Sequence, residues 1–165
     1  MKLIRYWCRK GLAAVYLAAA LLMALLFAWQ AGAGMPCVLP MTALSWCFML
    51  MLRTADDCFD YEQDRGRKKQ YLRKNQLLLM LCVLGAVLVL LHLWFFGMPG
   101  LICLAAVGYI PLMNRFPVIK PAFLPLLFAM YDLLTGTGFG LRQAAVFAAM
   151  LMLAGSYALY KRKSE

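Results

Sequence analysis

The sequence predicts an all-α integral membrane protein with about six transmembrane helices, folded as a single membrane domain over residues 1–165. Its composition is the first reason: 65% of the residues are hydrophobic, only 15% are charged, and the mean hydropathy is +0.75. Soluble domains contain about a quarter charged residues, and long uncharged apolar runs are typical of membrane spans. The second reason is that such runs alternate with short segments containing Gly, Pro or charged residues. The third is that the basic residues collect on one side of the resulting topology.

The expected helices cover residues 11–29, 36–56, 75–96, 101–113, 121–134 and 143–160. The first follows a basic N-terminal segment, and the rival interpretation of this arrangement is a signal peptide. However, the uncharged run from Gly11 to Gly34 is longer than the roughly 7–15 residues of a signal-peptide apolar core. We therefore interpret residues 11–29 as a transmembrane helix.

Length constrains the remaining helices, because one crossing takes roughly twenty residues. The apolar run 41–52 is too short to cross alone, so the second helix is expected to start near Met35 and to continue past Arg53. The runs 101–113 and 121–134 are also short. We expect these two helices to be tilted, extended by neighbouring polar residues, or partly re-entrant.

The basic residues set the orientation. Six crossings place both termini on one side, and sixteen of the seventeen Lys and Arg residues fall on that side, with Arg142 alone on the other. They lie in the N-terminal segment, the polar segment 53–74, the loop 114–120 and the C-terminal tail. The positive-inside rule therefore predicts that both termini and the polar segment are cytoplasmic. The expected location is the bacterial inner (cytoplasmic) membrane.

The composition argues against nucleic-acid binding, a disulfide framework and a zinc site. The net charge of +10 suits contact with anionic lipid headgroups, whereas no basic surface rich in aromatic residues is available to bind nucleic acid. The six cysteines are scattered singly, without a CxxC pair, so neither a disulfide framework nor a zinc site is predicted.

The polar segment 53–74 is the main candidate for function, because it holds five of the seven acidic residues. Asp56, Asp60 and Asp64 are spaced four residues apart, and Asp57 lies three residues before Asp60 and seven before Asp64. On a helix these spacings bring all four to one face. Like charges at these spacings destabilise a helix unless a cation compensates them. Nearby arginines can supply part of that charge, and a divalent ion does so better.

Carboxylates are hard oxygen ligands that suit Mg²⁺, which is usually bound by one or two carboxylates together with substrate phosphates. At a membrane surface rich in Lys and Arg, the segment indicates a magnesium-bridged diphosphate whose apolar part lies in the bilayer. The metal would withdraw negative charge from the diphosphate as the diphosphate leaves. The alternative is a solvated cytoplasmic loop of mixed charge.

The order Arg53-x-x-Asp56-Asp57-x-x-Asp60-x-x-x-Asp64 resembles the first Asp-rich motif, NDxxDxxxD, of the UbiA superfamily of intramembrane prenyltransferases. Its position at the cytoplasmic end of the second helix also agrees, although Asp56 stands where Asn is usual. The resemblance implies that Asp57, Asp60 and Asp64 bind Mg²⁺. It also implies that Asp56 and Arg53 bind the diphosphate group of a polyprenyl donor. The CDP-alcohol phosphotransferases fit less well, because their motif requires Gly where Tyr61 follows Asp60.

The resemblance covers the N-terminal half of the family's fold, so the chain is expected to form a UbiA-like half bundle. Family members are longer and carry a second motif, DxxxD, whereas here Asp132 is followed four residues later by Gly136. The Arg-Pro pair often found after the first motif is also missing. A homodimer or a second half-chain is therefore implied as a partner if the protein transfers the prenyl group to an aromatic or other acceptor. No catalytic residue is assigned, and the alternative is a non-catalytic membrane scaffold or remnant of that fold.

Four further residues are candidates. Arg115 and Lys120 lie in a cytoplasmic loop and are candidate diphosphate contacts, although topology alone also explains basic residues there. Asp132 costs roughly 2.5–3.5 kcal/mol to insert within an apolar helix, which by itself suggests a function. Because it lies toward the outer end of its helix, an interfacial or helix-terminus role is expected instead. His92 is expected to be a hydrogen-bonded structural residue.

Overall fold

A computed structural model describes residues 2–8, 12–32, 34–62, 72–101, 108–109, 112, 119, 122–135 and 140–164. Within these ranges the chain is helical and contains no β-strand. The elements are α1 (Lys2–Cys8), α2 (Leu12–Ala31), the 3₁₀ turn η2 (Met35–Cys37), α3 (Val38–Phe59), α4 (Lys74–Phe96), α6 (Phe123–Thr135) and α7 (Leu141–Ser164). Most of the predicted helix 101–113 lies outside the described residues.

Three of the described helices are long and apolar enough to cross a membrane, judged by length and composition. These segments are Ala13–Ala31, Met35–Phe59 and Lys74–Phe96, of 19, 25 and 23 residues. The helix predicted for 36–56 corresponds to α3 together with η2, and it continues past Arg53 as the length of a crossing requires. An all-helical chain with several apolar spans is thus what the composition predicts.

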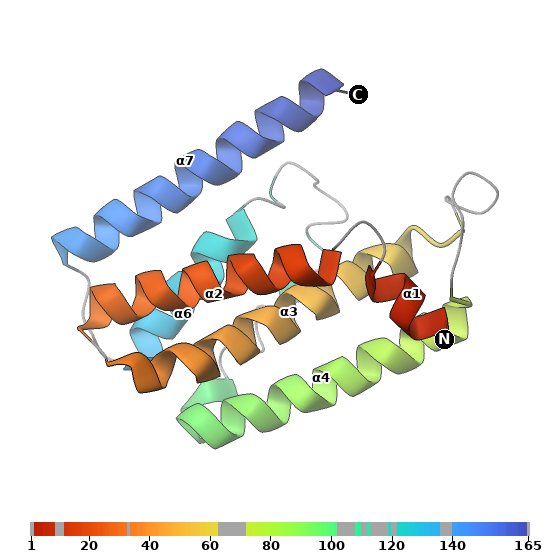
Figure 1. Ribbon diagram of the computed structural model, residues 1–165, viewed down its shortest axis with the longest axis horizontal. Coiled ribbons are helices and arrows are strands. Elements are labelled where there is room, and N and C mark those ends of the chain that lie inside the picture. The colour runs from red at the N-terminus through yellow and green to blue at the C-terminus, as the bar shows by residue number, and fades with distance from the viewer. Residues whose placement is uncertain are drawn as a thin grey trace.

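The three helices form an up-down-up arrangement, and glycines with positive φ follow the first and the third of them. α2 and α3 lie side by side, with α4 along the other side of α3 (Figure 1). Gly32, with φ +62°, follows α2, and Gly97, with φ +64°, ends α4; both lie in the left-handed region that favours Gly. Gly100 folds back on α4 so closely that a Cβ there would lie 2.7 Å from the His92 carbonyl oxygen.

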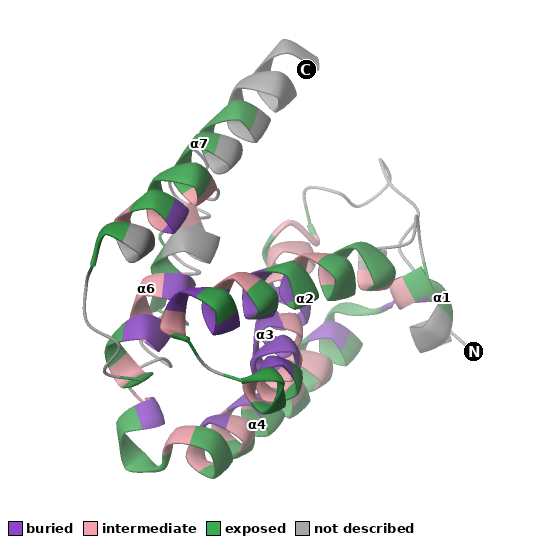
Figure 2. Cartoon of the chain, turned by 60° about the vertical axis from the view of Figure 1, so that its left-hand side comes forward, coloured by how far each residue is buried: buried purple, intermediate pink, exposed green. Residues whose placement is uncertain are grey.

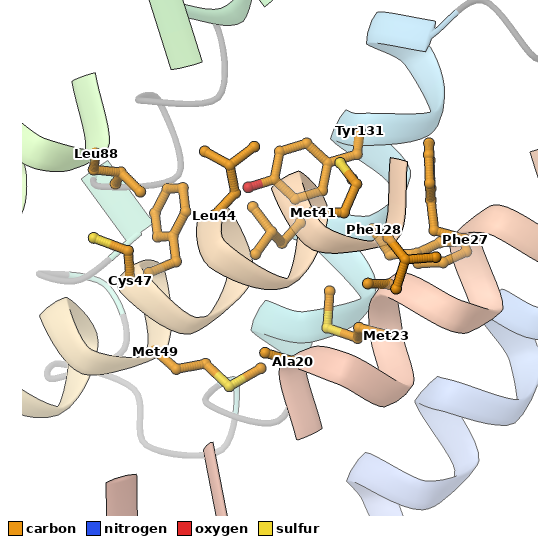
Figure 3. Close-up of a cluster of buried hydrophobic side chains, with 14 of the residues drawn as sticks. Ala20, Met23, Phe27, Met41, Leu44, Cys47, Met49, Leu88, Phe128 and Tyr131 are labelled. Carbon is orange, nitrogen blue, oxygen red and sulfur yellow. The ribbon is translucent and has the colours of Figure 1, made fainter. Parts of the chain in front are cut away.

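α3 is the central helix of the core. In the most apolar 18-residue stretch of Met35–Phe59, half of the residues are buried, whereas only 17% are buried in the corresponding stretch of α4. Figure 2 shows this difference as buried residues running along α3 between its neighbours. Side chains of α2, α3 and α6 meet in one cluster, in which Leu44, Phe48 and Tyr131 are inaccessible to solvent (Figure 3).

The outer faces remain apolar. On α4, Leu79 and Leu90 are each 66% exposed and Trp94 is 83% exposed. A soluble monomer rarely exposes so much contiguous apolar surface, whereas lipid contact requires it. Thr42 and Thr54 are buried in α3 and donate to the carbonyl oxygens four residues earlier, so that these hydroxyls are satisfied within the helix. Both features suit a helix bundle in a bilayer.

Candidate functional site

The acidic end of α3 is the first part of the site. Asp56 and Asp57 lie in the last turn of α3, and the helix ends at Phe59. Asp60 is its C-cap residue, with φ −81° and ψ 2°, and its N–H donates to the Asp56 carbonyl oxygen at 2.9 Å. The face of four aspartates expected from the spacing is therefore interrupted in the structure. Asp56 and Asp57 are helical, Asp60 caps the helix, and Asp64 lies outside the described residues.

This arrangement is electrostatically unfavourable without cations. The C-terminal end of a helix carries partial negative charge, and carboxylates there are destabilising. The last turn of α3 contains no basic residue. The net formal charge of this group is −2, from the three carboxylates of Asp56, Asp57 and Asp60 and the guanidinium of Arg53. Such a group attracts further cations, from neighbouring basic side chains or from a divalent ion.

Arg53 links two of the aspartates from one turn earlier in α3. Its Nη1 donates to Asp56 Oδ2 at 3.2 Å and its Nη2 donates to Asp57 Oδ1 at 2.5 Å. The side chains of all three residues are partly buried, with 23–31% of their surfaces exposed. The i+3 and i+4 spacings place both carboxylates within reach of one planar guanidinium, whose fork of donors can bind both.

Tyr6 supplies a contact that the sequence does not predict. Its hydroxyl donates to Asp57 Oδ2 at 2.8 Å, so that both oxygens of Asp57 are engaged within the protein. Burial of the ring and the adjacent negative charge of Asp57 raise the pKa of the Tyr6 hydroxyl above its usual range. The phenol is therefore neutral at physiological pH and remains a hydrogen-bond donor.

α1 brings Tyr6 to this position. α1 lies beside the C-terminal end of α3 and the first turn of α4 (Figure 1). Tyr6 is 8% exposed and packs with Leu72 and Leu77 in a small second core. The Trp7 ring meets the Tyr6 ring edge to face, with centroids 4.8 Å apart.

The other predicted ligands are described only in part. Asp64, Arg115 and Lys120 lie outside the described residues. Among the residues that the structure does describe, no group of three or more His, Cys, Asp or Glu side chains is arranged to hold a metal ion. The structure thus brings together Asp56, Asp57, Arg53 and the unpredicted Tyr6.

Asp132 belongs to a different part of the molecule. It is 6% exposed and accepts a hydrogen bond from Gln30 Nε2 at 2.6 Å, while Gln30 Oε1 is buried without a hydrogen-bond partner. Gln30 lies near the C-terminal end of α2, at the end of the bundle opposite the C-terminus of α3 (Figure 1). Asp132 is therefore remote from the acidic end of α3. It lies in the last turn of α6, near the end of the helix as expected, and its side chain is buried.

His92 is buried and hydrogen-bonded, as the structural interpretation of this residue requires. Its Nδ1 lies 2.8 Å from the Leu88 carbonyl oxygen, which can only accept, so Nδ1 carries the proton. Its Nε2 then accepts from the Tyr131 hydroxyl at 3.4 Å. The His92 ring also stacks on Tyr131 and meets Phe48 edge to face. These contacts connect α4 to α3 and α6.

Tyr6 and Gln30 are the two polar residues that sequence reasoning missed. Gln30 carried a weak signal, because it is a polar residue directly after the predicted apolar helix 11–29. Tyr6 carried none beyond its place between basic residues.

Comparison with protein-family models, with curated proteins and with solved structures gave no match. The functional assignment therefore depends on the chemistry of the residues themselves.

Proposed function

We propose that this chain is a UbiA-like, half-length integral membrane protein that binds Mg²⁺ and a polyprenyl diphosphate beside the C-terminal end of α3. The observation that supports the proposal is the succession of Asp56, Asp57 and Asp60 over the last turn and the cap of an apolar helix, with Arg53 paired to Asp56 and Asp57. Carboxylates at the negative end of a helix favour a bound cation. The adjoining bilayer provides the environment that a polyprenyl chain needs.

The residues of this cluster fit such a ligand chemically. Each carboxylate oxygen has two lone pairs, so Asp57 can accept from Arg53 and Tyr6 and still contact a metal ion. Asp57, Asp60 and Asp64 would hold Mg²⁺, with Asp56, Arg53, Arg115 and Lys120 on the diphosphate side. A bound Mg²⁺ would neutralise charge on the departing diphosphate.

The same proposal includes six membrane crossings, both termini in the cytoplasm and a location in the bacterial inner membrane. The distribution of Lys and Arg supports this orientation. Prenyl transfer to an aromatic or other acceptor would require the second Asp-rich motif from a partner, either a second copy of this chain or a separate half-chain. The mass of the detergent-solubilised complex distinguishes a monomer from a dimer.

Asp60→Asn is expected to weaken binding of geranylgeranyl diphosphate by about tenfold or more in lipid nanodiscs with Mg²⁺, because a charge-assisted contact is worth roughly 1.5–3 kcal/mol. Equilibrium binding of the radiolabelled diphosphate measures this. Glu62→Gln is the matched control. Glu62 is an exposed acid of the same segment, paired with Lys74 at 3.5 Å, and its replacement is expected to leave binding unchanged. Equal losses in the two variants would contradict a specific role for the Asp cluster.

One observation favours the alternative, a non-catalytic membrane scaffold. Arg53 and Tyr6 occupy both oxygens of Asp57, which by itself would fasten α1 to the end of α3. In that case Asp60→Asn changes neither diphosphate binding nor assembly with a partner. Absence of prenyl transfer to every acceptor tested, with Mg²⁺ and lipid present, would further favour the scaffold.

A further inference from the structure

α1 is fixed to the acidic end of α3 by apolar packing and by a partly buried hydrogen bond. The aromatic ring of Tyr6 lies against Leu72 and Leu77, and the partly buried side chains of Cys58 and Tyr61 pack against the same cluster. Its hydroxyl group donates to Asp57 Oδ2, while Arg53 donates to the other oxygen of the same carboxylate. Two independent interactions, one apolar and one polar, thus converge on Tyr6.

The two donors act on opposite oxygens of the same carboxylate. Arg53 Nη2 holds Asp57 Oδ1 at 2.5 Å, and the Tyr6 hydroxyl holds Oδ2 at 2.8 Å. A carboxylate held by a single donor can still rotate about its terminal torsion, which is broad in Asp. Donors on both oxygens remove that freedom. The orientation of Asp57 therefore depends on a residue that lies 51 positions earlier in the chain.

We propose that Tyr6 is a positioning residue for the cluster, which holds the Asp57 carboxylate in the orientation that binds the divalent cation. The inference rests on the proposed function. Carboxylates that bind metals are themselves usually hydrogen-bonded, and removal of such a partner typically lowers metal affinity by 10–100-fold. The buried phenol suits this role because it donates a hydrogen bond without adding a charge to the cluster.

Mn²⁺ is the probe, measured by electron paramagnetic resonance on the full chain in lipid nanodiscs. Tyr6→Phe keeps the ring and its packing but removes the hydroxyl, and it is expected to weaken Mn²⁺ binding by about 10–100-fold. Tyr109→Phe is the matched control. It removes a hydroxyl that donates to the Ile119 carbonyl oxygen at 2.8 Å, and it is expected to leave Mn²⁺ affinity unchanged.

Two further readouts separate positioning from a general loss of structure. Cys58 packs beside Tyr6, so its alkylation rate, in a variant where it is the only cysteine, reports whether α1 remains docked. This rate is expected to be the same with Tyr6 and with Phe at that position. In an Asp57→Asn background, Tyr6→Phe is expected to cause no further loss of Mn²⁺ affinity, because Tyr6 acts through Asp57.

The outcomes distinguish this inference from the proposed function. If the wild-type protein binds no Mn²⁺, the proposed function itself is overturned. If the wild-type protein binds Mn²⁺ and Tyr6→Phe binds it equally well, only the positioning role is overturned. Tighter binding by Tyr6→Phe would also overturn it, since the hydroxyl would then compete with the metal. So would weaker binding accompanied by faster alkylation of Cys58, which would indicate that α1 had undocked.

Discussion

Replacing Arg53 by Met is expected to lower the free energy of unfolding by about 1–3 kcal/mol, the usual effect of leaving charged, partly buried hydrogen-bonding groups unsatisfied. Arg53 is the common donor to Asp56 and Asp57, which lie in the last turn of α3 where the helix dipole already disfavours negative charge. Met keeps most of the side-chain volume, so the loss is electrostatic. Unfolding of the purified protein in mixed micelles, titrated with SDS, measures the change.

Two control variants make the Arg53 result specific. Arg53→Lys retains the charge but cannot hold two carboxylates with one planar fork, so an intermediate loss is expected. Lys74→Met removes a cation from an exposed pair with Glu62, in which 47% and 60% of the side-chain surfaces are accessible, and such pairs contribute at most about 1 kcal/mol. An Arg53→Met protein as stable as the wild type would contradict the account of the acidic end of α3.

Replacing Asp132 by Leu is expected to destabilise the other end of the bundle by about 1–3 kcal/mol, because the amide of Gln30 is then left buried without its partner. Gln30 is 5% exposed and Asp132 6% exposed, so water cannot replace the lost hydrogen bond without rearrangement of α2 and α6. The same SDS titration measures the effect. Since this pair is remote from the acidic end of α3, Mn²⁺ affinity is expected to stay unchanged.

A double-mutant cycle isolates the Gln30–Asp132 interaction. Gln30→Leu combined with Asp132→Leu removes both polar groups, and it is expected to be more stable than the sum of the single losses predicts. Coupling energies between helices in membranes average about 0.6 kcal/mol and reach about 1.7 kcal/mol. The coupling energy of the Gln30–Asp132 pair, whose hydrogen bond is 2.6 Å long, is expected to fall in that range. Strictly additive losses would show that the two side chains do not stabilise each other.

The long helices were predictable because the bilayer constrains them. A crossing needs a roughly fixed length of apolar helix, and the composition of residues 13–31 and 74–96 leaves few other structures. The same length requirement predicted that the second helix continues beyond Arg53, and α3 does so. The short helix α1 was not predicted, since its seven residues carry no periodic signal of their own and depend on packing against α3 and α4.

The acidic cluster was predictable in composition but not in geometry. The regular spacing of the aspartates assumes a continuous helix, whereas α3 ends at Phe59 and Asp60 becomes its cap. Spacing alone does not determine where a helix stops. The ion pairs of Arg53 follow from local i+3 and i+4 spacings and agree with the expectation that nearby arginines supply part of the compensating charge. The contacts of Tyr6 with Asp57 and of Gln30 with Asp132 join residues 51 and 102 positions apart, and only the packed fold brings them together.

The central claim is that the acidic end of α3 binds a polyprenyl diphosphate through Mg²⁺. Its most direct test is equilibrium binding of radiolabelled geranylgeranyl diphosphate to the wild-type protein in lipid nanodiscs, measured with Mg²⁺ and again after chelation with EDTA. We expect saturable binding with Mg²⁺ and its loss with EDTA, since the carboxylates would then repel the diphosphate directly. Binding that is absent in both conditions, or equal in both, would contradict the claim.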